Sequence, residues 1–447
     1  MSKEKPVIGT EGIYDARTLG APRMLVLGIQ HMFAMFGATV LVPVLTGLSV
    51  TTTLLFAGLG TLLFHLLAKG KVPAFLGSSF AFLAGYQAIA PNKEPELLPY
   101  ACAGVAVAGL LYVILAALFR AFGAQKVMRF FPPIVTGPVI ICIGLTLSSS
   151  ALNNCAKNWP IALVAIVVVI VCNIWGKGMI KIIPILLGVV ASYVVAAITG
   201  NVDFTLVEKA AWIGSPVEME RTVFALFGDC DTSLLVSSMI TIVPLALATM
   251  IEHIGDICAI SSTCERTYLA DPGLHRPLLG DGLATPLASL FGAPANTTYG
   301  ENTGVLALSK VYDPRVIRIA AGLAVLLSFS PKFGALVTVM PAATMGGVSM
   351  ILYGMISAIG VRNVVENKVD FTNSRNVIIA AIIMVLAIGI AFSKAGAIVI
   401  PAGEATIRLS GLAVASLVGI ILNAILPGKD YEFGVDEQGD TSVNFKV

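Results

Sequence analysis

Residues 296–309 read NTTYGENTGVLALS, and residues 76–82 read LGSSFAF. Both runs are polar or rich in small residues, and both are flanked by long apolar stretches. Interrupted segments at corresponding positions in two halves of a chain are typical of broken helices that meet near the midplane of membrane transporters. The ends of such helices present unpaired backbone N–H groups to a substrate. The two runs therefore predict where the working site lies.

The composition around these runs is that of a chain surrounded by lipid. Hydrophobic residues make up 57% of the 447 residues and charged residues only 12%, about half of the ~25% found in an average soluble domain. A membrane-crossing helix needs about 20 apolar residues. Fourteen such spans are predicted, at 24–45, 50–68, 72–90, 100–119, 131–151, 160–176, 182–200, 234–257, 278–293, 294–309, 316–335, 341–360, 376–393 and 409–426.

The two halves of the chain repeat one another. Residues 30–31, Gln-His, correspond to residues 252–253, Glu-His, and residues 77–80 correspond to residues 297–300 about 220 positions later. Each half has an odd number of spans, so the second copy must be inverted in the membrane, as in secondary transporters. We therefore expect an all-α polytopic fold of two inverted seven-helix repeats, with short extended segments in spans 3 and 10.

The charges predict the orientation of these parts. Threading fourteen spans from a cytoplasmic N-terminus places 21 of the 28 Lys and Arg residues inside, in agreement with the positive-inside rule. The predicted parts are a cytoplasmic tail at 1–23, a first repeat at 24–200, an acidic extracytoplasmic loop at 201–233, a second repeat at 234–426 and a cytoplasmic tail at 427–447.

Four acids lie in or beside the predicted spans, namely Glu252, Asp256, Asp281 and Glu301. An ionised side chain near the centre of a membrane helix costs about 2.5–3.5 kcal/mol on insertion scales, so such residues are usually functional. For Asp281 and for Asp256 the alternative is a wet position at a span end. No Lys or Arg is close to them in sequence, and burial without a cation favours the protonated form. Reversible protonation, and hence proton coupling, is the predicted role.

Asp256 is the main candidate for proton coupling, since it shares a helix face with Glu252 at the i, i+4 spacing. His31 is a weaker candidate, because a buried histidine is more often a packed core residue. Phe80, Tyr299 and Tyr353 could stack on a flat substrate, and the first two belong to the interrupted runs. The seven cysteines form no CxxC pair, and we expect no metal site and no cofactor.

Several stretches resemble the nucleobase–ascorbate transporter family, and its uracil permease branch in particular. They are QHMFAMFGATVLVPVL (30–45), GSSFAF (77–82), EHIGD (252–256), DPGLHR (271–276), NTTYGENTGVLALSKVY (296–312) and GGVSMILYG (346–354). The resemblance covers nearly the whole chain. It implies fourteen spans, with spans 1–4 and 8–11 in a core domain and spans 5–7 and 12–14 in a gate domain. A homodimer through the gate domain is a further implication.

The same resemblance assigns roles to individual residues. It implies that Glu252 and Glu301 hydrogen-bond the ring nitrogens of a nucleobase, while Phe80 and Tyr299 border its ring. It also implies that backbone N–H groups near Phe80 and at Gly300 meet the carbonyls of the base. Ser79 would belong to this group, and Tyr353 would close the pocket from the gate domain.

Two positions depart from the uracil branch. Uracil-type members can carry histidine at the position of Asp256 and asparagine at that of Asp281, so these aspartates favour a purine carrier. Ser309 is a mild change from the usual threonine of the signature. Glu301 favours uracil, because xanthine and urate carriers commonly have glutamine there.

We therefore expect a proton-coupled uracil importer of the inner membrane, working by alternating access. A xanthine or urate symporter driven by protons or sodium is the alternative within the family, and an anion exchanger or channel is the alternative of another class. The sequence contains no nucleophile–base constellation, metal-ligand spacing or phosphate loop, so we do not expect an enzyme. The expected partners are the nucleobase, protons and the lipid bilayer, without nucleic acid.

Overall fold

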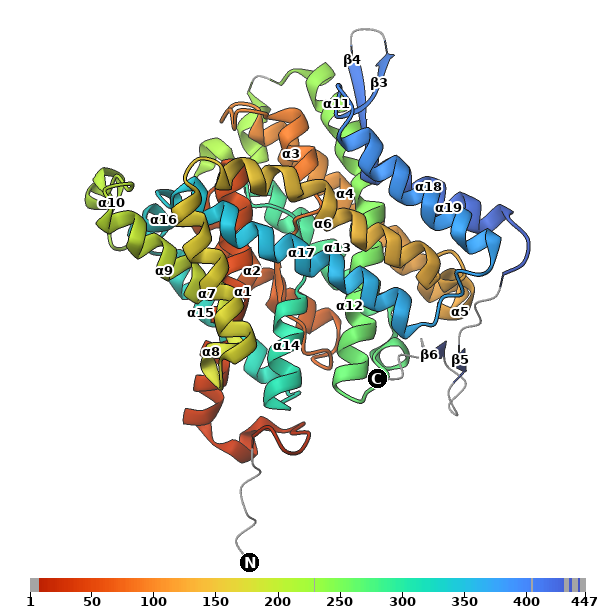
Figure 1. Cartoon of the computed structure of the whole chain (residues 1–447), viewed down its shortest axis with the longest axis horizontal. Coiled ribbons are helices and arrows are strands. Elements are labelled where there is room, and N and C mark those ends of the chain that lie inside the picture. The colour runs from red at the N-terminus through yellow and green to blue at the C-terminus, as the bar shows by residue number, and fades with distance from the viewer. Residues whose placement is uncertain (1–7, 229, 403–404, 430–433, 436–440, 443–447) are drawn as a thin grey trace, which may run out of the picture.

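The structure is a computed structural model that describes residues 8–228, 230–402, 405–429, 434–435 and 441–442. Helices dominate these residues (Figure 1). The first half contains η1 (Ala16–Leu19), α1 (Ala21–Thr46), α2 (Val50–Leu67), β1 (Leu76–Ser78), α3 (Leu83–Ile89), α4 (Leu98–Phe122), α5 (Ala124–Met128), α6 (Pro133–Cys155), α7 (Trp159–Trp175), α8 (Met179–Ile182), α9 (Pro184–Ile198) and α10 (Thr205–Lys209).

The second half begins with the short turns η2 (Met219–Arg221) and η3 (Val223–Phe227). It continues with α11 (Thr232–Ile242), η4 (Val243–Leu245), α12 (Ala246–Thr263), η5 (Leu269–Gly273), α13 (His275–Leu290), β2 (Asn296–Thr298), α14 (Gly300–Ser309), α15 (Pro314–Ser328), α16 (Pro331–Thr338), α17 (Ala342–Glu366), α18 (Ser374–Ala391), β3 (Ala397–Ala402), β4 (Ala405–Ser410), α19 (Gly411–Ile425), β5 (Gly434–Val435) and β6 (Thr441–Ser442).

Each of the fourteen predicted spans contains a helix. Among the described residues, seven helical stretches are long and apolar enough to cross a membrane, including the continuous stretch Thr232–Thr263 that joins α11 to α12. Large apolar side chains also face outward, among them Trp175, Ile198 and Val385. Lipid is the solvent in which such a surface is stable. The chain is therefore a multi-pass membrane protein.

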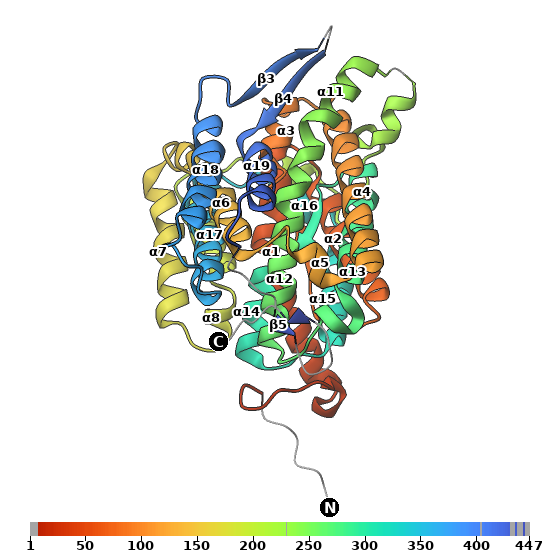
Figure 2. The ribbon, with the colours of Figure 1, turned by 90° about the vertical axis from the view of Figure 1, so that its right-hand side faces the viewer.

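One predicted span is not straight. The segment 316–335 was expected as a single helix, but α15 and α16 meet at an angle of 90°. The cause is local, since Pro331 has no N–H and cannot continue the hydrogen bonding of α15. Ser330 instead caps the new helix by accepting a hydrogen bond from the N–H of Phe333. The sequence also did not predict the β3–β4 hairpin, which lies at the opposite end of the molecule from the N-terminal segment (Figure 2).

Both predicted interruptions are present, and they meet. Strand β1 pairs antiparallel with β2, with Leu76 opposite Thr298 and Ser78 opposite Asn296. The helices that follow each strand, α3 and α14, are short. Gly77 is required here because a Cβ at this position would lie 2.3 Å from the ring of Tyr299. The two halves of the chain are therefore joined at the centre of the molecule.

Neighbouring helices satisfy the backbone of this small sheet. The N–H of Leu76 donates to Thr61 of α2 at 2.8 Å, and Thr285 of α13 donates to the carbonyl of Asn296 at 3.0 Å. In a membrane interior these bonds replace the ones that water would supply. Extended backbone is tolerated at this depth because α2 and α13 enclose it.

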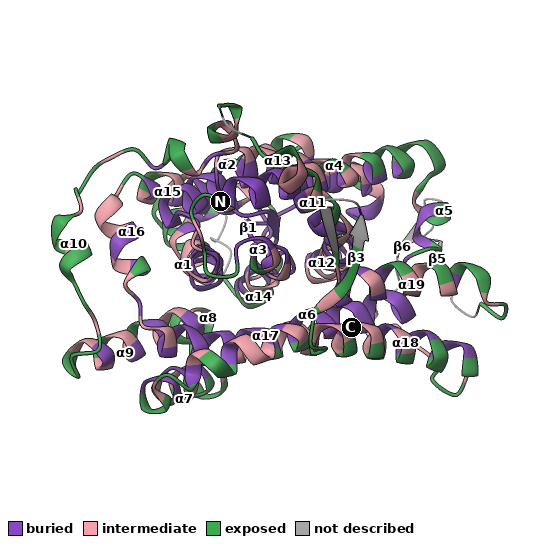
Figure 3. Ribbon diagram, turned by 90° about the horizontal axis from the view of Figure 1, so that it is seen from above, coloured by how far each residue is buried: buried purple, intermediate pink, exposed green. Residues whose placement is uncertain are grey.

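The helices form two groups, which Figure 3 shows as two rows seen from above. In one group α13 packs against α4 and α2, and α15 packs against α2 and α1. In the other, α17 packs against α6 and α7, and α18 packs against α19 and α6. Gly144 allows α6 to approach α17 closely, since a Cβ there would lie 2.1 Å from the carbonyl oxygen of Tyr353.

Candidate functional site

A cavity of about 350 Å³ lies between the two groups of helices, beside the strand pair. This volume is at the lower end of the range for small-molecule sites. Six of the predicted site residues line it, namely Phe80, Glu252, Asp256, Tyr299, Gly300 and Glu301. The cavity extends from these residues to Lys181, Arg362 and Glu366.

Two helices supply the carboxylates of the cavity. Glu252 and Asp256 lie one turn apart on α12, as their spacing predicts, and Glu301 lies in the first turn of α14. Among the described residues, Oε2 of Glu252 has no hydrogen-bond partner. Of the two cations that line the cavity, Arg362 is paired with Glu366. The inner part of the cavity is therefore an acceptor-rich site.

A chain of polar groups leads from the cavity into the core. The hydroxyl of Thr298 donates to Oδ2 of Asp256 at 2.8 Å and lies 3.5 Å from Nδ1 of His253. That same Nδ1 lies 2.9 Å from Oδ2 of Asp281, and both of these side chains are fully buried. Asp281 is therefore inside the core and not at a wet span end, and it is connected to the cavity only through this chain of described groups.

The surroundings of His253 are otherwise apolar. The rings of Phe64 and Tyr112 approach its imidazole edge-on, with centroids 6.4 and 6.3 Å away. His253 does not line the cavity, unlike Glu252 and Asp256 on the same helix. Its pairing with Asp281, and the connecting role of Thr298, were missed because the three residues belong to separate elements.

His31 does not line the cavity but lies behind α14. The side chain of Asn302 donates from Nδ2 to the backbone oxygen of His31 at 3.1 Å and lies 3.1 Å from its Nδ1. Among the described groups, Nε2 of His31 has no partner. His31 is thus linked to the residue next to Glu301 and not to the cavity itself. Asn302 belongs to the 296–309 run, but the sequence did not single it out.

The predicted aromatic residues take different positions. The hydroxyl of Tyr299 donates to the backbone oxygen of Ser78 at 2.8 Å, which fixes its ring at the cavity wall. Tyr353 on α17 is buried behind Phe80, with the two ring centroids 5.7 Å apart at an angle of 77°. Ser79 is also buried outside the cavity, and its N–H donates to the carbonyl of Ala295 at 2.8 Å.

Phe80 separates the cavity from a second one. A space of about 260 Å³ is lined by residues of α3 and α6, and by residues at the base of the β3–β4 hairpin such as Ala397 and Arg408. Among the described residues that line the two cavities, Phe80 is the only one common to both. Phe80, supported by Tyr353, is therefore the partition between the carboxylate site and the hairpin end of the molecule.

Sequence and structure comparisons place the chain among transport proteins. The model of the permease family matches residues 22–396. The uracil permease of Bacillus subtilis (strain 168) is 39% identical, with 99% of each chain covered. The uracil permease of Escherichia coli (strain K12) is 36% identical, with 89% of this chain and 90% of that protein covered.

Solved structures share the fold at low sequence identity. The transmembrane domain of the cyanobacterial bicarbonate transporter BicA matches with a TM-score of 0.56 at 16% identity, covering 92% of this chain and 99% of that chain. The murine anion transporter Solute Carrier 26 family member A9, in its inward-facing state, matches with a TM-score of 0.62 at 12% identity, covering 90% and 67%. Identities this low support the fold alone.

Proposed function

This chain belongs to the permease family, a family of transporters and not of enzymes, and we propose that it carries uracil into the cell together with protons. One observation carries the proposal. Glu252 from α12 and Glu301 from α14 face one small cavity bordered by Phe80 and Tyr299. A neutral, flat molecule with ring N–H donors complements such a site.

Uracil has these properties. Its two ring N–H groups donate to carboxylate oxygens, which act purely as acceptors when ionised and form their strongest hydrogen bonds in that state. Glu252 and Glu301 are the acceptors, and Phe80 and Tyr299 contact the ring. Gly300 lines the cavity and begins α14, whose unpaired N-terminal N–H groups are available to a substrate oxygen.

Proton coupling uses the buried acids. Asp256 is the primary proton acceptor, because it lines the cavity next to Glu252 and accepts a hydrogen bond from Thr298. Thr298 connects it to His253 and Asp281. Several carboxylates in one membrane-embedded site repel one another when all are ionised, so bound protons lower the cost of the substrate-free site. Glu252 takes part from the cavity itself, and His31 takes part through its contact with Asn302, the residue next to Glu301.

Transport proceeds by alternating access on two inverted seven-span repeats. The core domain comprises α1–α4 and α11–α16, and the gate domain comprises α6–α9 and α17–α19. The antiparallel β1–β2 pair at the centre supports an inverted duplication. With both termini in the cytoplasm of the inner membrane, the cavity lies toward the inside, because it contains Thr263 at the end of α12 that the N-terminal segment contacts.

A purine carrier is the second candidate, favoured by the aspartates at 256 and 281. An anion exchanger or channel is the alternative of another class, and the two solved structures of similar fold are of a bicarbonate transporter and an anion transporter. The charge of the site disfavours this alternative. Four acids line the cavity, and three of them, Glu252, Asp256 and Glu301, would repel an anion, while Glu366 is paired with Arg362.

Uptake into proteoliposomes tests the proposal. Radiolabelled uracil and xanthine are supplied with and without an inward proton gradient, and separately with a sodium gradient. We expect uracil uptake that the proton gradient drives above equilibrium. Glu301→Gln should abolish it, while Glu220→Gln, a control at an exposed position of the 201–233 loop, should not. Preferred uptake of xanthine would establish the purine alternative, and uptake of neither base would refute nucleobase transport.

A further inference from the structure

The N-terminal segment ahead of α1 is attached to the end of α14. We call residues 9–20 the N-terminal strap. The N–H of Gly9 donates to the carbonyl of Ser309 at 2.9 Å, and the N–H of Ile13 donates to that of Lys310 at 2.8 Å. The carbonyl of Ile13 in turn accepts from the N–H of Tyr312 at 2.8 Å. The strap thereby pairs with backbone groups that the end of a helix leaves unsatisfied.

One side chain of the strap joins α14 to α12. The hydroxyl of Tyr14 donates to the carbonyl of Cys264, the residue that ends α12, at 2.9 Å. Its ring lies 5.4 Å from the ring of Tyr312, just beyond α14, and 4.3 Å from the guanidinium carbon of Arg266. Tyr14 therefore contacts the ends of both helices that carry the carboxylates of the cavity.

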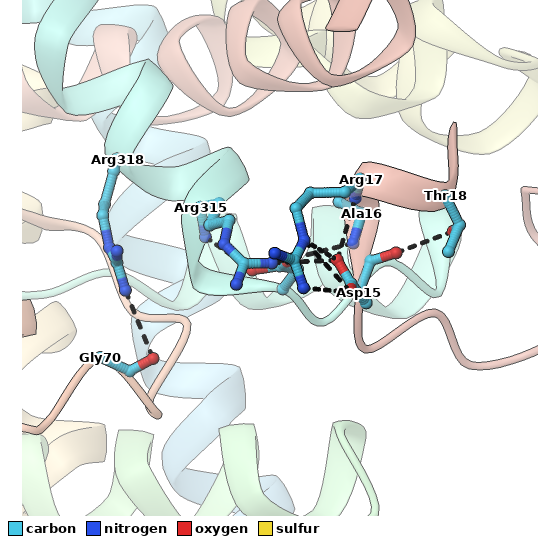
Figure 4. Close-up of polar contacts among 8 residues, drawn as sticks. Asp15, Ala16, Arg17, Thr18, Gly70, Arg315 and Arg318 are labelled. Atoms are coloured by element: carbon cyan, nitrogen blue, oxygen red, sulfur yellow. Dashed lines mark hydrogen bonds and ion pairs between the residues drawn. The ribbon is translucent and has the colours of Figure 1, made fainter. Parts of the chain in front are cut away.

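A network of charges and hydrogen bonds anchors the residues that follow Tyr14 (Figure 4). The N–H of Ala16 donates to Oδ2 of Asp313 at 2.7 Å, in a buried position. Nη1 of Arg315 lies 3.0 Å from both Asp15 and Asp313. The guanidinium of Arg17 beside Asp15 holds the pKa of that carboxyl well below its usual range.

Apolar packing completes the attachment. Ile13, Ala16 and Leu19 of the strap are buried against Val311 and Val316. The strap is therefore packed against the folded core. Backbone hydrogen bonds, ion pairs and apolar burial all hold it there.

The geometry points to a positioning role for the strap in substrate recognition. We propose that it sets the separation of α12 and α14, and thereby the separation of Glu252 and Glu301. Helix α14 has only ten residues, so its strapped end is about 12 Å from Glu301 at 1.5 Å per residue. The cavity runs along both helices, from Glu252 to Thr263 on α12 and from Gly300 to Leu308 on α14. Because the strap connects the ends of α12 and α14, it limits how far the two helices can move apart along the cavity.

Tyr14 and Asp15 are thus positioning residues that act through the two helices. This inference rests on the proposed function for its binding readout. A carboxylate pair at fixed separation distinguishes uracil, which has two ring N–H donors, from 1-methyluracil, which has one. If the strap fixes that separation, loosening it reduces this discrimination. A strap that only stabilised the fold would change the amount of active protein but not the selectivity of each active site.

Binding of uracil and 1-methyluracil to purified protein, normalised to active sites, tests the proposal. Tyr14→Ala should weaken uracil binding by about two- to tenfold, the factor that one net hydrogen bond represents, and should lower the uracil preference. Tyr14→Phe keeps the ring contacts and should show a smaller effect. Tyr193→Phe is the control, since it removes an equivalent hydroxyl-to-carbonyl bond, at 2.9 Å to Leu336, away from the strap. Unchanged affinity and selectivity in Tyr14→Ala would overturn the proposal.

Hydrogen exchange gives a readout that does not depend on the substrate. Exchange of the amides at the end of α12 should be faster in Tyr14→Phe, which loses the bond to Cys264, and exchange in both α12 and α14 should be faster in Tyr14→Ala. Exchange in α17 should be unchanged. If the wild type binds no nucleobase but shows this exchange pattern, the proposed function is refuted, while the role of the strap in holding the two helices is still supported. If Tyr14→Ala does not fold, the same measurements are made on Tyr14→Phe and Asp15→Asn. Equal exchange in these helices in the wild type and in the folded variants would show that the strap does not hold α12 and α14 together.

Discussion

Oδ2 of Asp281 lies 2.9 Å from Nδ1 of His253, and neither side chain is exposed. The two residues come from α13 and α12 and meet behind the cavity. Among the described residues, Oδ1 of Asp281 and Nε2 of His253 have no hydrogen-bond partner. The contact with His253 is therefore the close polar contact of Asp281, whereas His253 also lies 3.5 Å from the hydroxyl of Thr298.

Asp281→Ala should destabilise the protein strongly. Removing one partner of a buried polar contact leaves the other unsatisfied, which typically costs about 1–3 kcal/mol. Asp281→Asn keeps the shape and one acceptor, so it should cost less. Thermal unfolding of both variants in detergent gives the comparison. Melting temperatures equal to that of the wild type would contradict the importance of the pair.

Glu252→Gln and Glu301→Gln should each weaken uracil binding by about ten- to hundredfold. A hydrogen bond to a charged group contributes about 1.5–3 kcal/mol, and each 1.4 kcal/mol is a factor of ten in affinity. Equilibrium binding of radiolabelled uracil to purified protein measures the change. Glu220→Gln, with its side chain exposed on the 201–233 loop, should bind like the wild type. Wild-type affinity in Glu301→Gln would mean that the substrate binds elsewhere.

Asp256→Asn should impair proton-driven accumulation more than binding. The side chain retains an oxygen that accepts the hydrogen bond of Thr298 but can no longer be ionised or protonated. We therefore expect uracil counterflow between equal pH compartments to persist while accumulation against a concentration gradient falls. Thr298→Val, which removes the donor and keeps the shape, should show an intermediate defect. Full accumulation by Asp256→Asn would assign the proton to another group.

Phe80→Ala should open a path between the two cavities. Phe80 is the residue that lines both among those described, and Tyr353 supports its ring from α17. Liposomes loaded with radiolabelled uracil should lose it faster with Phe80→Ala than with the wild type in the absence of a gradient. Tyr353→Phe keeps the supporting ring and should not leak. Slow release from Phe80→Ala would place the barrier at another residue.

The effect of Asp15→Asn on uracil binding should not depend on pH between 5.5 and 7.5. Arg17 lowers the pKa of Asp15 in the folded protein. A group with a depressed folded pKa contributes its stability above the unfolded value of about 3.9 and loses it only as the pH falls below that value. The affinity ratio of wild type to variant should therefore be constant in this window. A ratio that changes with pH would indicate that the strap titrates with another group.

The interrupted segments were predictable because their signal is local. Polar and small residues within an apolar context fail to form a continuous membrane helix wherever they occur, and 76–82 and 296–309 both have this composition. Glu252, Asp256 and Glu301 were found for the same reason, since a lone acid within an apolar span is costly in any membrane fold. The bend at Pro331 has an equally local cause. It was not predicted, because the apolar length of 316–335 indicated a single continuous span.

The sequence by itself thus determined that lipid surrounds the chain, where its two interrupted segments lie and that Glu252, Asp256 and Glu301 are candidate site residues. Only the tertiary structure decided which of these groups touch. The pairing of His253 with Asp281, the partition at Phe80 and the strap from Tyr14 to α12 and α14 each join residues from separate elements. Hydropathy is a property of neighbouring residues along the chain, whereas these contacts depend on how the two halves pack, which no short stretch of sequence contains.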